Sequence, residues 1–234
     1  PAVIGGKSVA VPGEVAGLLS ALDKFGTMSR IQVMQPAIDH AEQGITVSPV
    51  LAGIITDNYE AIATFPASGK IFLNDGLPKE AGDTLRNPDL ANTLRLIADQ
   101  GHDAFYKGPV AESIVDAVQS DGGLMTMEDL ASFDVSYRTP VTSTYRGYEI
   151  ISAPPPSSGG THVIELLNIM ENFDVEKMGL NSAQSIHVWA EAMKLMYSDR
   201  ADYMGDSDFI EVPLQGLTSK EYARDQFARI DMNS

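Results

Sequence analysis

The spacing of apolar residues changes along the chain, and this change limits the possible folds more than any other feature. Residues 135–154, "VSYRTPVTSTYRGYEIISAP", are rich in β-branched and aromatic side chains that alternate with polar ones, so we expect two strands there. Pro140 cannot donate to a strand ladder, so the first strand is expected to be interrupted or at an edge. Elsewhere in the sequence, apolar residues recur with the spacing of an α-helix. The pattern predicts an α+β fold that is helix-rich with a small β element.

Capping residues mark where the helices begin. A side-chain oxygen just before a helix accepts a hydrogen bond from a free backbone N–H of the first turn. Pro36 falls inside the helical pattern "SRIQVMQPAIDHAEQG", so we expect a kink or a break there. Caps are expected at Ser29, Ser48, Asn87, Thr126 and Asn181.

Composition excludes several classes of protein. The net charge of -16 repels phosphate backbones, so we expect no nucleic-acid partner. The chain has no cysteine, which rules out disulfides, thiolate metal sites and a cysteine nucleophile. No apolar run reaches the ~20 residues that a membrane span needs. With no linker in view, we expect a single domain over residues 1–234. The sequence lacks both a starting Met and a signal peptide, so we expect the chain to begin inside a longer gene product.

Metal and cofactor motifs are missing from the sequence. Its four histidines are scattered and form no spaced ligand pair, and no phosphate-binding Gly–Lys–Ser/Thr loop occurs. The acidic stretch "RADYMGDSDF" places its glycine before the aspartate pair, which is the wrong order for a Ca²⁺ loop. We therefore expect no metal and no cofactor.

Thr161 and His162 follow two glycines at the start of a helical pattern. A threonine that cleavage turns into a chain terminus can act as a nucleophile, with its own amine as base. Cleavage there would separate the expected strand from the helix that it introduces. A plain helix start is the better interpretation.

The last long helical segment carries an expected apolar stripe that includes Arg200. An unpaired guanidinium on such a stripe costs several kcal/mol, so Arg200 needs a partner. Nearby aspartates suggest a structural ion pair, and a substrate-carboxylate role is the alternative. The stripe consists of Ile186, Trp189, Met193, Met196 and Arg200, and the nearby acids are Asp199, Asp202 and Asp206.

Five ordered blocks resemble the large subunit of the γ-glutamyltransferases (γ-glutamyltranspeptidases). One block is "PPPSSGG" at residues 154–160 followed by "LLNIMENFD" at residues 166–174. The resemblance covers nearly the whole chain. The other blocks are "VPGEVAGLLSALDKFGTM" at residues 11–28, "NPDLANTLRLIADQGHDAFYKGPVAESIVDAV" at residues 87–118, "GGLMTMEDLASF" at residues 122–133 and "EAMKLMYSDRADYMGDSDF" at residues 191–209.

The resemblance implies an N-terminal nucleophile hydrolase with a four-layer αββα sandwich. In that family a precursor cleaves itself before a threonine, which then attacks the γ-glutamyl amide of glutathione or a related donor. The acyl group passes to an amino acid, a peptide or water. The partner of this chain would be the small subunit of the same precursor, and the location would be periplasmic or secreted.

The resemblance assigns no catalytic and no donor-binding residue to this chain. The nucleophile belongs to a Thr-Thr-His type start of the small subunit, and no Thr-Thr occurs here. The chain is therefore expected to be an incomplete segment of a large subunit, inactive by itself. The alternatives are a cephalosporin-acylase-like relative, a poly-γ-glutamate-processing relative and a non-enzymatic helical interaction module.

We expect residues 154–160, which form the corner between the expected strand and the next helix, to have structural roles. Prolines fix φ, and paired glycines permit a tight entry to the helix. One of the two serines is expected to cap the helix and to brace the cleft indirectly. The structural candidates are Pro156, Ser157, Ser158, Gly159, Gly160 and Arg200.

Overall fold

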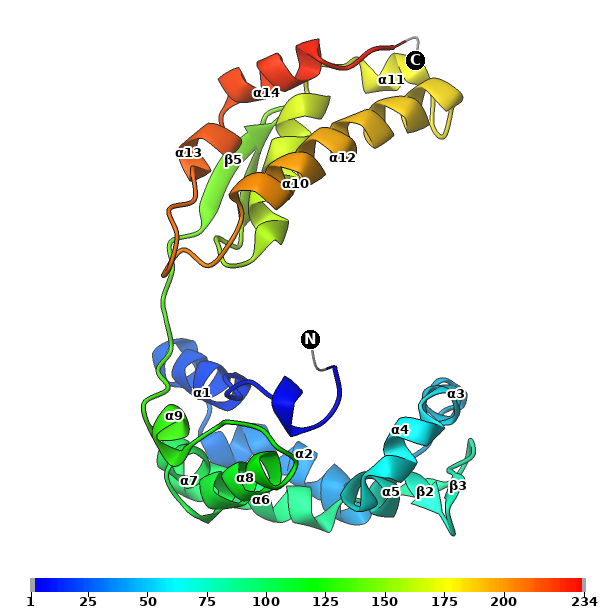
Figure 1. Cartoon of the computed structure of the whole chain (residues 1–234), viewed down its shortest axis with the longest axis vertical. Coiled ribbons are helices and arrows are strands. Elements are labelled where there is room, and N and C mark those ends of the chain that lie inside the picture. The colour runs from blue at the N-terminus through cyan, green and yellow to red at the C-terminus, as the bar shows by residue number, and fades with distance from the viewer. Residues whose placement is uncertain (1–2, 233–234) are drawn as a thin grey trace. The chain divides into compact units, whose positions relative to one another are not determined.

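The computed structural model describes residues 3–232 and divides the chain into two compact units (Figure 1). Unit 1 is Pro1–Ser136 and unit 2 is Tyr137–Ser234. Each has its own buried core and is described separately below. The single domain that the sequence predicts over residues 1–234 stays a prediction.

Unit 1 is made of helices with two pairs of very short strands between them. Its two small sheets pair β1 with β4 and β2 with β3, both antiparallel. Its elements are η1 (Gly6–Ser8), α1 (Glu14–Phe25), α2 (Arg30–Gln43), β1 (Ile45–Thr46), α3 (Pro49–Asp57), α4 (Tyr59–Thr64), α5 (Pro66–Phe72), β2 (Leu73–Asn74), β3 (Leu77–Pro78), β4 (Thr84–Leu85), α6 (Pro88–Gln100), α7 (His102–Tyr106), α8 (Pro109–Ser120) and α9 (Met127–Ala131).

Unit 2 begins with a hairpin and continues with helices. The strands β5 (Val141–Tyr145) and β6 (Tyr148–Ser152) pair antiparallel, so the two predicted strands are confirmed. The helix-rich α+β class is confirmed as well. The helices of unit 2 are α10 (Ser158–Met170), α11 (Val175–Met178), α12 (Ala183–Tyr203), α13 (Leu214–Leu217) and α14 (Lys220–Ala228).

Four of the five predicted caps are confirmed. The side chains of Ser29, Ser48, Asn87 and Thr126 each accept a hydrogen bond from a backbone N–H three residues on. The cap at Asn181 is wrong, because Ser182 caps α12 through the N–H of Ser185. Asn181 itself has a positive φ of 55°. The neighbouring serine occupies the extended conformation that a cap requires, whereas Asn181 makes the turn before it.

Helix α2 continues through Pro36, so the predicted break does not occur. A proline inside a helix removes one backbone hydrogen bond. The packing of α2 on α6 compensates, since Ile38 is buried against Ala91 and Ala98. Tertiary contacts therefore decide the course of this helix, and the local preference of proline does not.

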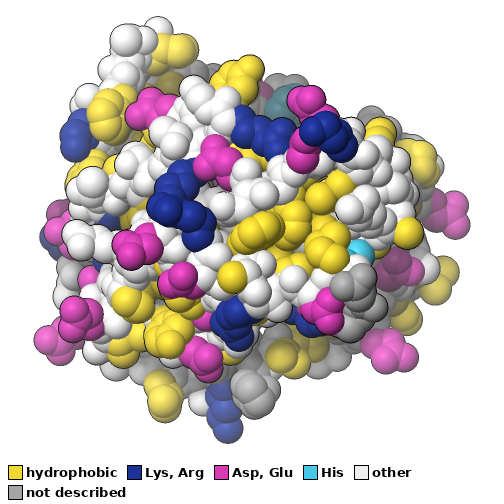
Figure 2. Space-filling model, turned by 90° about the horizontal axis from the view of Figure 1, so that it is seen from above, with side chains coloured by type: hydrophobic (Ala, Val, Ile, Leu, Met, Phe, Trp, Pro, Cys, Tyr) yellow, Lys and Arg dark blue, Asp and Glu magenta, His cyan; other side chains and the backbone are white. Residues whose placement is uncertain are grey.

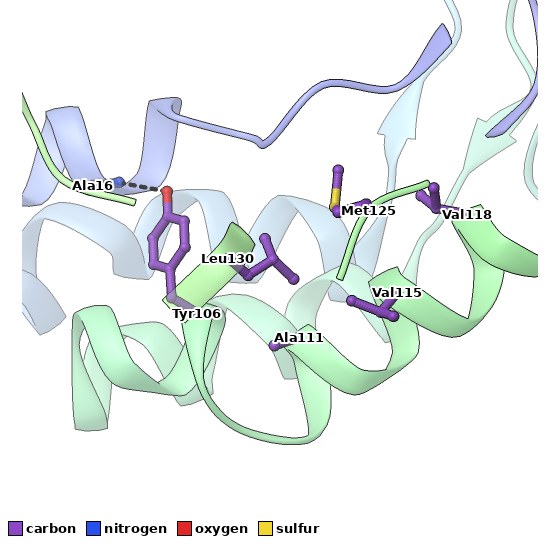
Figure 3. Packing of buried hydrophobic residues seen from close by; sticks show 7 residues of the cluster. All are labelled: Ala16, Tyr106, Ala111, Val115, Val118, Met125 and Leu130. Carbon is purple, nitrogen blue, oxygen red and sulfur yellow. Dashed lines mark hydrogen bonds between the residues drawn. The ribbon is translucent and has the colours of Figure 1, made fainter. Parts of the chain in front are cut away.

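The core of unit 1 gathers around Tyr106, which is fully buried (Figure 3). The Tyr106 hydroxyl accepts a hydrogen bond from Ala16 N at 3.1 Å and donates to Pro12 O at 2.5 Å. The ring thereby ties α7 to the first turn of α1. The buried cluster consists of Ala16, Tyr106, Ala111, Val115, Val118, Met125 and Leu130.

The core of unit 2 lies between α10, α12 and α14. Phe173 and Phe227 meet edge to face there, with ring centroids 4.7 Å apart. The hairpin packs against α10. The buried cluster consists of Ile169, Met170, Phe173, Val188, Ala192 and Ala223.

The predicted apolar stripe of α12 is wrong except for Met196. The buried face carries Val188, Ala192, Met196 and Asp199. Ile186, Trp189 and Met193 are 59%, 37% and 38% exposed. Apolar residues occur on two faces of α12, so spacing alone does not select the buried one.

On the face that Figure 2 shows, hydrophobic side chains lie in patches between charged ones.

Candidate functional site

The corner between β6 and α10 brings two backbones into close contact. Gly160 is buried in the first turn of α10. A Cβ at this position would lie 2.1 Å from Ala153 O and 2.8 Å from Ala153 N. Backbone atoms cannot move aside cheaply, so only glycine fits here. Gly159 differs, because the nearest atom to its Cβ would be Ser157 Oγ at 3.6 Å.

The two serines of the corner have different surroundings, and neither side chain caps α10. Ser157 occupies the capping position, but its side chain makes no capping hydrogen bond. Ser158 is the first helical residue, and its Oγ accepts a hydrogen bond from Arg200 Nε at 3.0 Å. This bond replaces the predicted ion pair of Arg200 with a nearby aspartate. Arg200 and Pro156 are both exposed.

A buried network of polar side chains joins α10, α12 and α14. His162 Nδ1 lies 2.8 Å from Glu165 Oε2 on the buried face of α10. Asp199 of α12 accepts hydrogen bonds at Oδ2 from Tyr222 Oη at 2.7 Å and from Gln226 Nε2 at 2.8 Å. Glu165 Oε1 is buried and has no hydrogen-bond partner among the described residues.

The proton positions in this network follow from burial and charge. Burial, together with the nearby charge of Asp199, raises the pKa of Glu165 to about 9, so its carboxyl group is neutral at pH 7. His162 Nδ1 and Glu165 Oε2 share one hydrogen bond, and the tautomer of His162 decides which of the two groups donates it. Burial and the charge of Arg200 lower the pKa of His162, which is therefore a neutral imidazole.

Thr161 does not have the surroundings of a nucleophile. It lies in the first turn of α10 with 0% exposure, and its Oγ1 has no hydrogen-bond partner among the described residues. A substrate cannot reach a hydroxyl at such a position. The interpretation of residues 160–162 as a helix start fits this geometry.

The buried network is the feature that the sequence analysis missed. Polar residues recur at positions 161, 162, 165 and 168 of α10, which is one helical face. Asn168 shows what such a residue does, because its Nδ2 donates to Thr218 O at 2.8 Å and its Oδ1 accepts from Ser143. A polar side chain on the face expected to be buried is a readable signal of a hydrogen-bonded network.

Within residues 3–232, no group of three or more His, Asp or Glu side chains is placed to hold a metal ion. No helix of that span has both the length and the apolar character needed to cross a bilayer.

Comparison with known proteins gives one consistent result. The sequence model of the family described as gamma-glutamyltranspeptidase matches residues 1–234. The chain is 47% identical over 223 residues to a "Glutathione hydrolase proenzyme" of Escherichia coli K12, covering 95% of this chain and 38% of that protein. It is 42% identical over 230 residues to an "Acylase ACY 1 proenzyme" of Pseudomonas sp. strain SE83, covering 98% of this chain and 41% of that protein.

A solved structure agrees with the sequence matches. The crystal structure of the Helicobacter pylori gamma-glutamyltranspeptidase superposes with a TM-score of 0.97 at 42% identity. The match covers 99% of this chain and 67% of that one. The chain thus spans about two fifths of the length of the curated relatives described above.

Proposed function

Because this chain belongs to the γ-glutamyltranspeptidase family, we propose that it is a segment of the large subunit of a γ-glutamyltransferase that uses glutathione. The complete enzyme would transfer the γ-glutamyl group to an amino acid, a peptide or water. The observation that carries this proposal is the 47% identity to the E. coli glutathione hydrolase proenzyme over 95% of the chain. The fold supports it, since the chain is an α+β part of an N-terminal nucleophile hydrolase.

We propose that another part of the precursor supplies the groups that act on the substrate. Acyl transfer needs an activated hydroxyl, donors for the oxyanion and a clamp for the donor substrate. Thr161 is buried, and no Thr-Thr sequence is present. The nucleophile would come from the small subunit, which the same precursor supplies by cleavage. This chain would be inactive by itself, and the enzyme would be periplasmic or secreted.

The role of unit 2 in this proposal is to hold its helices in fixed positions. The Gly160 contact fixes α10 to the end of β6, and the Asp199 hydrogen bonds fix α12 to α14. Groups that act on a substrate must keep their geometry within a fraction of an ångström, so such rigid supports matter although they touch no substrate.

The test compares the 234-residue chain with the complete gene product in a γ-glutamyl-p-nitroanilide assay. We expect turnover by the complete product and none by the chain alone. Turnover by the chain would show that it contains a nucleophile, and the proposed division of labour would then be wrong. Osmotic-shock fractions and culture medium, assayed separately from the cytoplasm, test the location.

A second candidate rests on the 42% identity to the Acylase ACY 1 proenzyme. A solved cephalosporin acylase from Bacillus halodurans is also similar to this chain, at 29% identity and a TM-score of 0.88, so in that case the donor would be the acyl side chain of a cephalosporin. The complete gene product can be assayed on glutathione and on a glutaryl-cephalosporin in parallel. A higher kcat/KM on the cephalosporin would favour the acylase function over the glutathione-dependent one.

A further inference from the structure

The helix α14 covers one side of the core of unit 2 with a small buried surface. It packs against α10 and α12 (Figure 1). Its buried residues are Ala223 and Gln226, and Phe227 is partly buried against the same core. The hydroxyl of Tyr222 and the amide of Gln226 both bond the Asp199 carboxylate of α12. An element with so few buried apolar contacts opens locally at a lower free energy than the rest of its domain.

A second carboxyl group, that of Glu165 on α10, is buried beside Asp199. Glu165 is 0% exposed and Asp199 is 6% exposed. Each of these two groups raises the pKa of Tyr222 by its charge, so Tyr222 of α14 lies close to both. The helix α14 therefore forms part of the cover that keeps water away from Glu165. Two buried carboxyl groups this close do not both ionise, because their charges repel in surroundings of low polarity.

Glu165 is the member of this pair that keeps its proton. Asp199 accepts hydrogen bonds from two donors, which stabilise a negative charge, whereas Glu165 Oε1 has no partner among the described residues. The partner of Glu165 Oε2 is His162 Nδ1. Burial and the charge of Arg200 lower the pKa of His162 from 6.5, so above pH 6.5 this imidazole is neutral in the folded and in the unfolded chain. It brings no positive charge that would ionise Glu165.

The remaining ionisable groups around the pair come from α12 and α14. Burial and the charge of Asp199 raise the pKa of Tyr222, so its hydroxyl keeps its proton in mildly alkaline solution. Arg200 stays positive there, and Tyr203 is the next neighbour, on the side of Tyr222. The strands β5 and β6 and the helix α13 also pack on α10, but among the described residues they place no group that shifts the pKa of Glu165. Glu165 is thus the group whose proton depends on the position of α14.

We propose that the docking of α14 is sensitive to pH: α14 opens from α10 and α12 with release of the proton that Glu165 holds, so it is docked in mild acid and opens increasingly in alkaline solution. In the open state water reaches Glu165, and its pKa returns to the ordinary 4.5, whereas in the docked state the pKa is about 9. Between pH 6.5 and 9 the equilibrium constant for opening therefore rises by about tenfold per pH unit. The inference uses groups of unit 2 alone and holds whatever the complete enzyme acts on.

Hydrogen exchange of the complete gene product, measured by mass spectrometry at about pH 6.5, 7.5 and 8.5, tests the proposal. Dividing the exchange rate of the unstructured peptide by the measured rate gives a protection factor, which removes the pH dependence of exchange itself. Protection of residues 220–228 in α14 should fall by about tenfold per pH unit, and that of residues 109–120 in α8 should stay constant. Protection in α14 should also be at least about tenfold lower than in α12. Protection of α14 that does not depend on pH, or that equals the protection of α12, would overturn the proposal.

Two variants assign the released proton. Glu165→Gln has no such proton, so the protection of α14 should no longer change between about pH 6.5 and 8.5. Glu221→Gln is the matched control, because it makes the same chemical change at an exposed position of α14 itself. This control should keep the tenfold change per pH unit. A pH dependence that survives in Glu165→Gln, or that disappears in Glu221→Gln, contradicts the role of Glu165.

Discussion

Replacing Glu165 with glutamine should make unit 2 more stable near neutral pH. The pKa of the Glu165 carboxyl group is about 9 in the folded chain, against 4.5 as its ordinary value. Between these two values the unfolded chain releases this proton, while the folded chain keeps it. The free energy of unfolding therefore falls as pH rises through this interval, by about 1.4 kcal/mol per pH unit. Below pH 4.5 the carboxyl group is protonated in both states, and the raised pKa no longer lowers the free energy of unfolding.

The size of the effect follows from the distance between the working pH and 4.5. At about pH 7.5 the interval covers about three units, so the cost is roughly 4 kcal/mol. Glutamine has nearly the shape of the neutral acid, and its amide can donate to or accept from His162 Nδ1, the partner of Glu165. Glu165→Gln should then raise the free energy of unfolding by up to about 4 kcal/mol at this pH, and by nearly nothing at about pH 4.5.

Urea unfolding followed by the fluorescence of Trp189 is the assay. This is the only tryptophan of the chain, and it lies on α12 in unit 2. Glu171→Gln is a control of opposite sign, because hydrogen bonds from Lys220 and Arg146 lower the pKa of Glu171. Replacing the Glu171 carboxylate should destabilise the chain at neutral pH, by less than about 1 kcal/mol, and should have no effect at low pH. A Glu165→Gln effect that is the same at both pH values would refute the neutral buried carboxyl group.

Three further predictions concern the corner and the core of unit 1. Gly160→Ala should lower the melting temperature of unit 2 by several degrees through its clash with the preceding backbone, whereas Gly159→Ala should be tolerated; circular dichroism measures both. Tyr106→Phe leaves a buried backbone N–H without its partner, so it should cost about 1–3 kcal/mol in urea unfolding followed by far-ultraviolet circular dichroism. In the complete enzyme, alanine at both Ser157 and Ser158 should lower the melting temperature more than it lowers kcat; the reverse would give these serines a direct part in catalysis.

Local signals in the sequence predicted the secondary structure where neighbouring residues decide it. Thr126 and Asp129 form the expected capping box, and the hairpin of β5 and β6 has the expected strands. Both depend on contacts over a few residues. At Pro36 the predicted break does not occur, and the predicted stripe of α12 is wrong except for Met196, because distant packing decides both.

The candidate site was less predictable than the fold. The sequence singled out the corner, but it gave no means to see that Gly160 meets Ala153 or that Ser158 bonds Arg200. The first contact depends on how tightly the corner turns, and the second joins helices that are distant along the chain. Glu165 had a local signal, since it falls on the buried face of α10. The shift of its pKa depends first on burial and then on Asp199, which lies on a different helix.

The hydrogen bonds at Asp199 determine how α14 can move. Tyr222 and Gln226, one helical turn apart, both donate to the same carboxylate oxygen. A rotation of α14 about its axis would break both bonds together and leave the buried carboxylate of Asp199 without these two donors. Rotations of this helix are therefore high in energy.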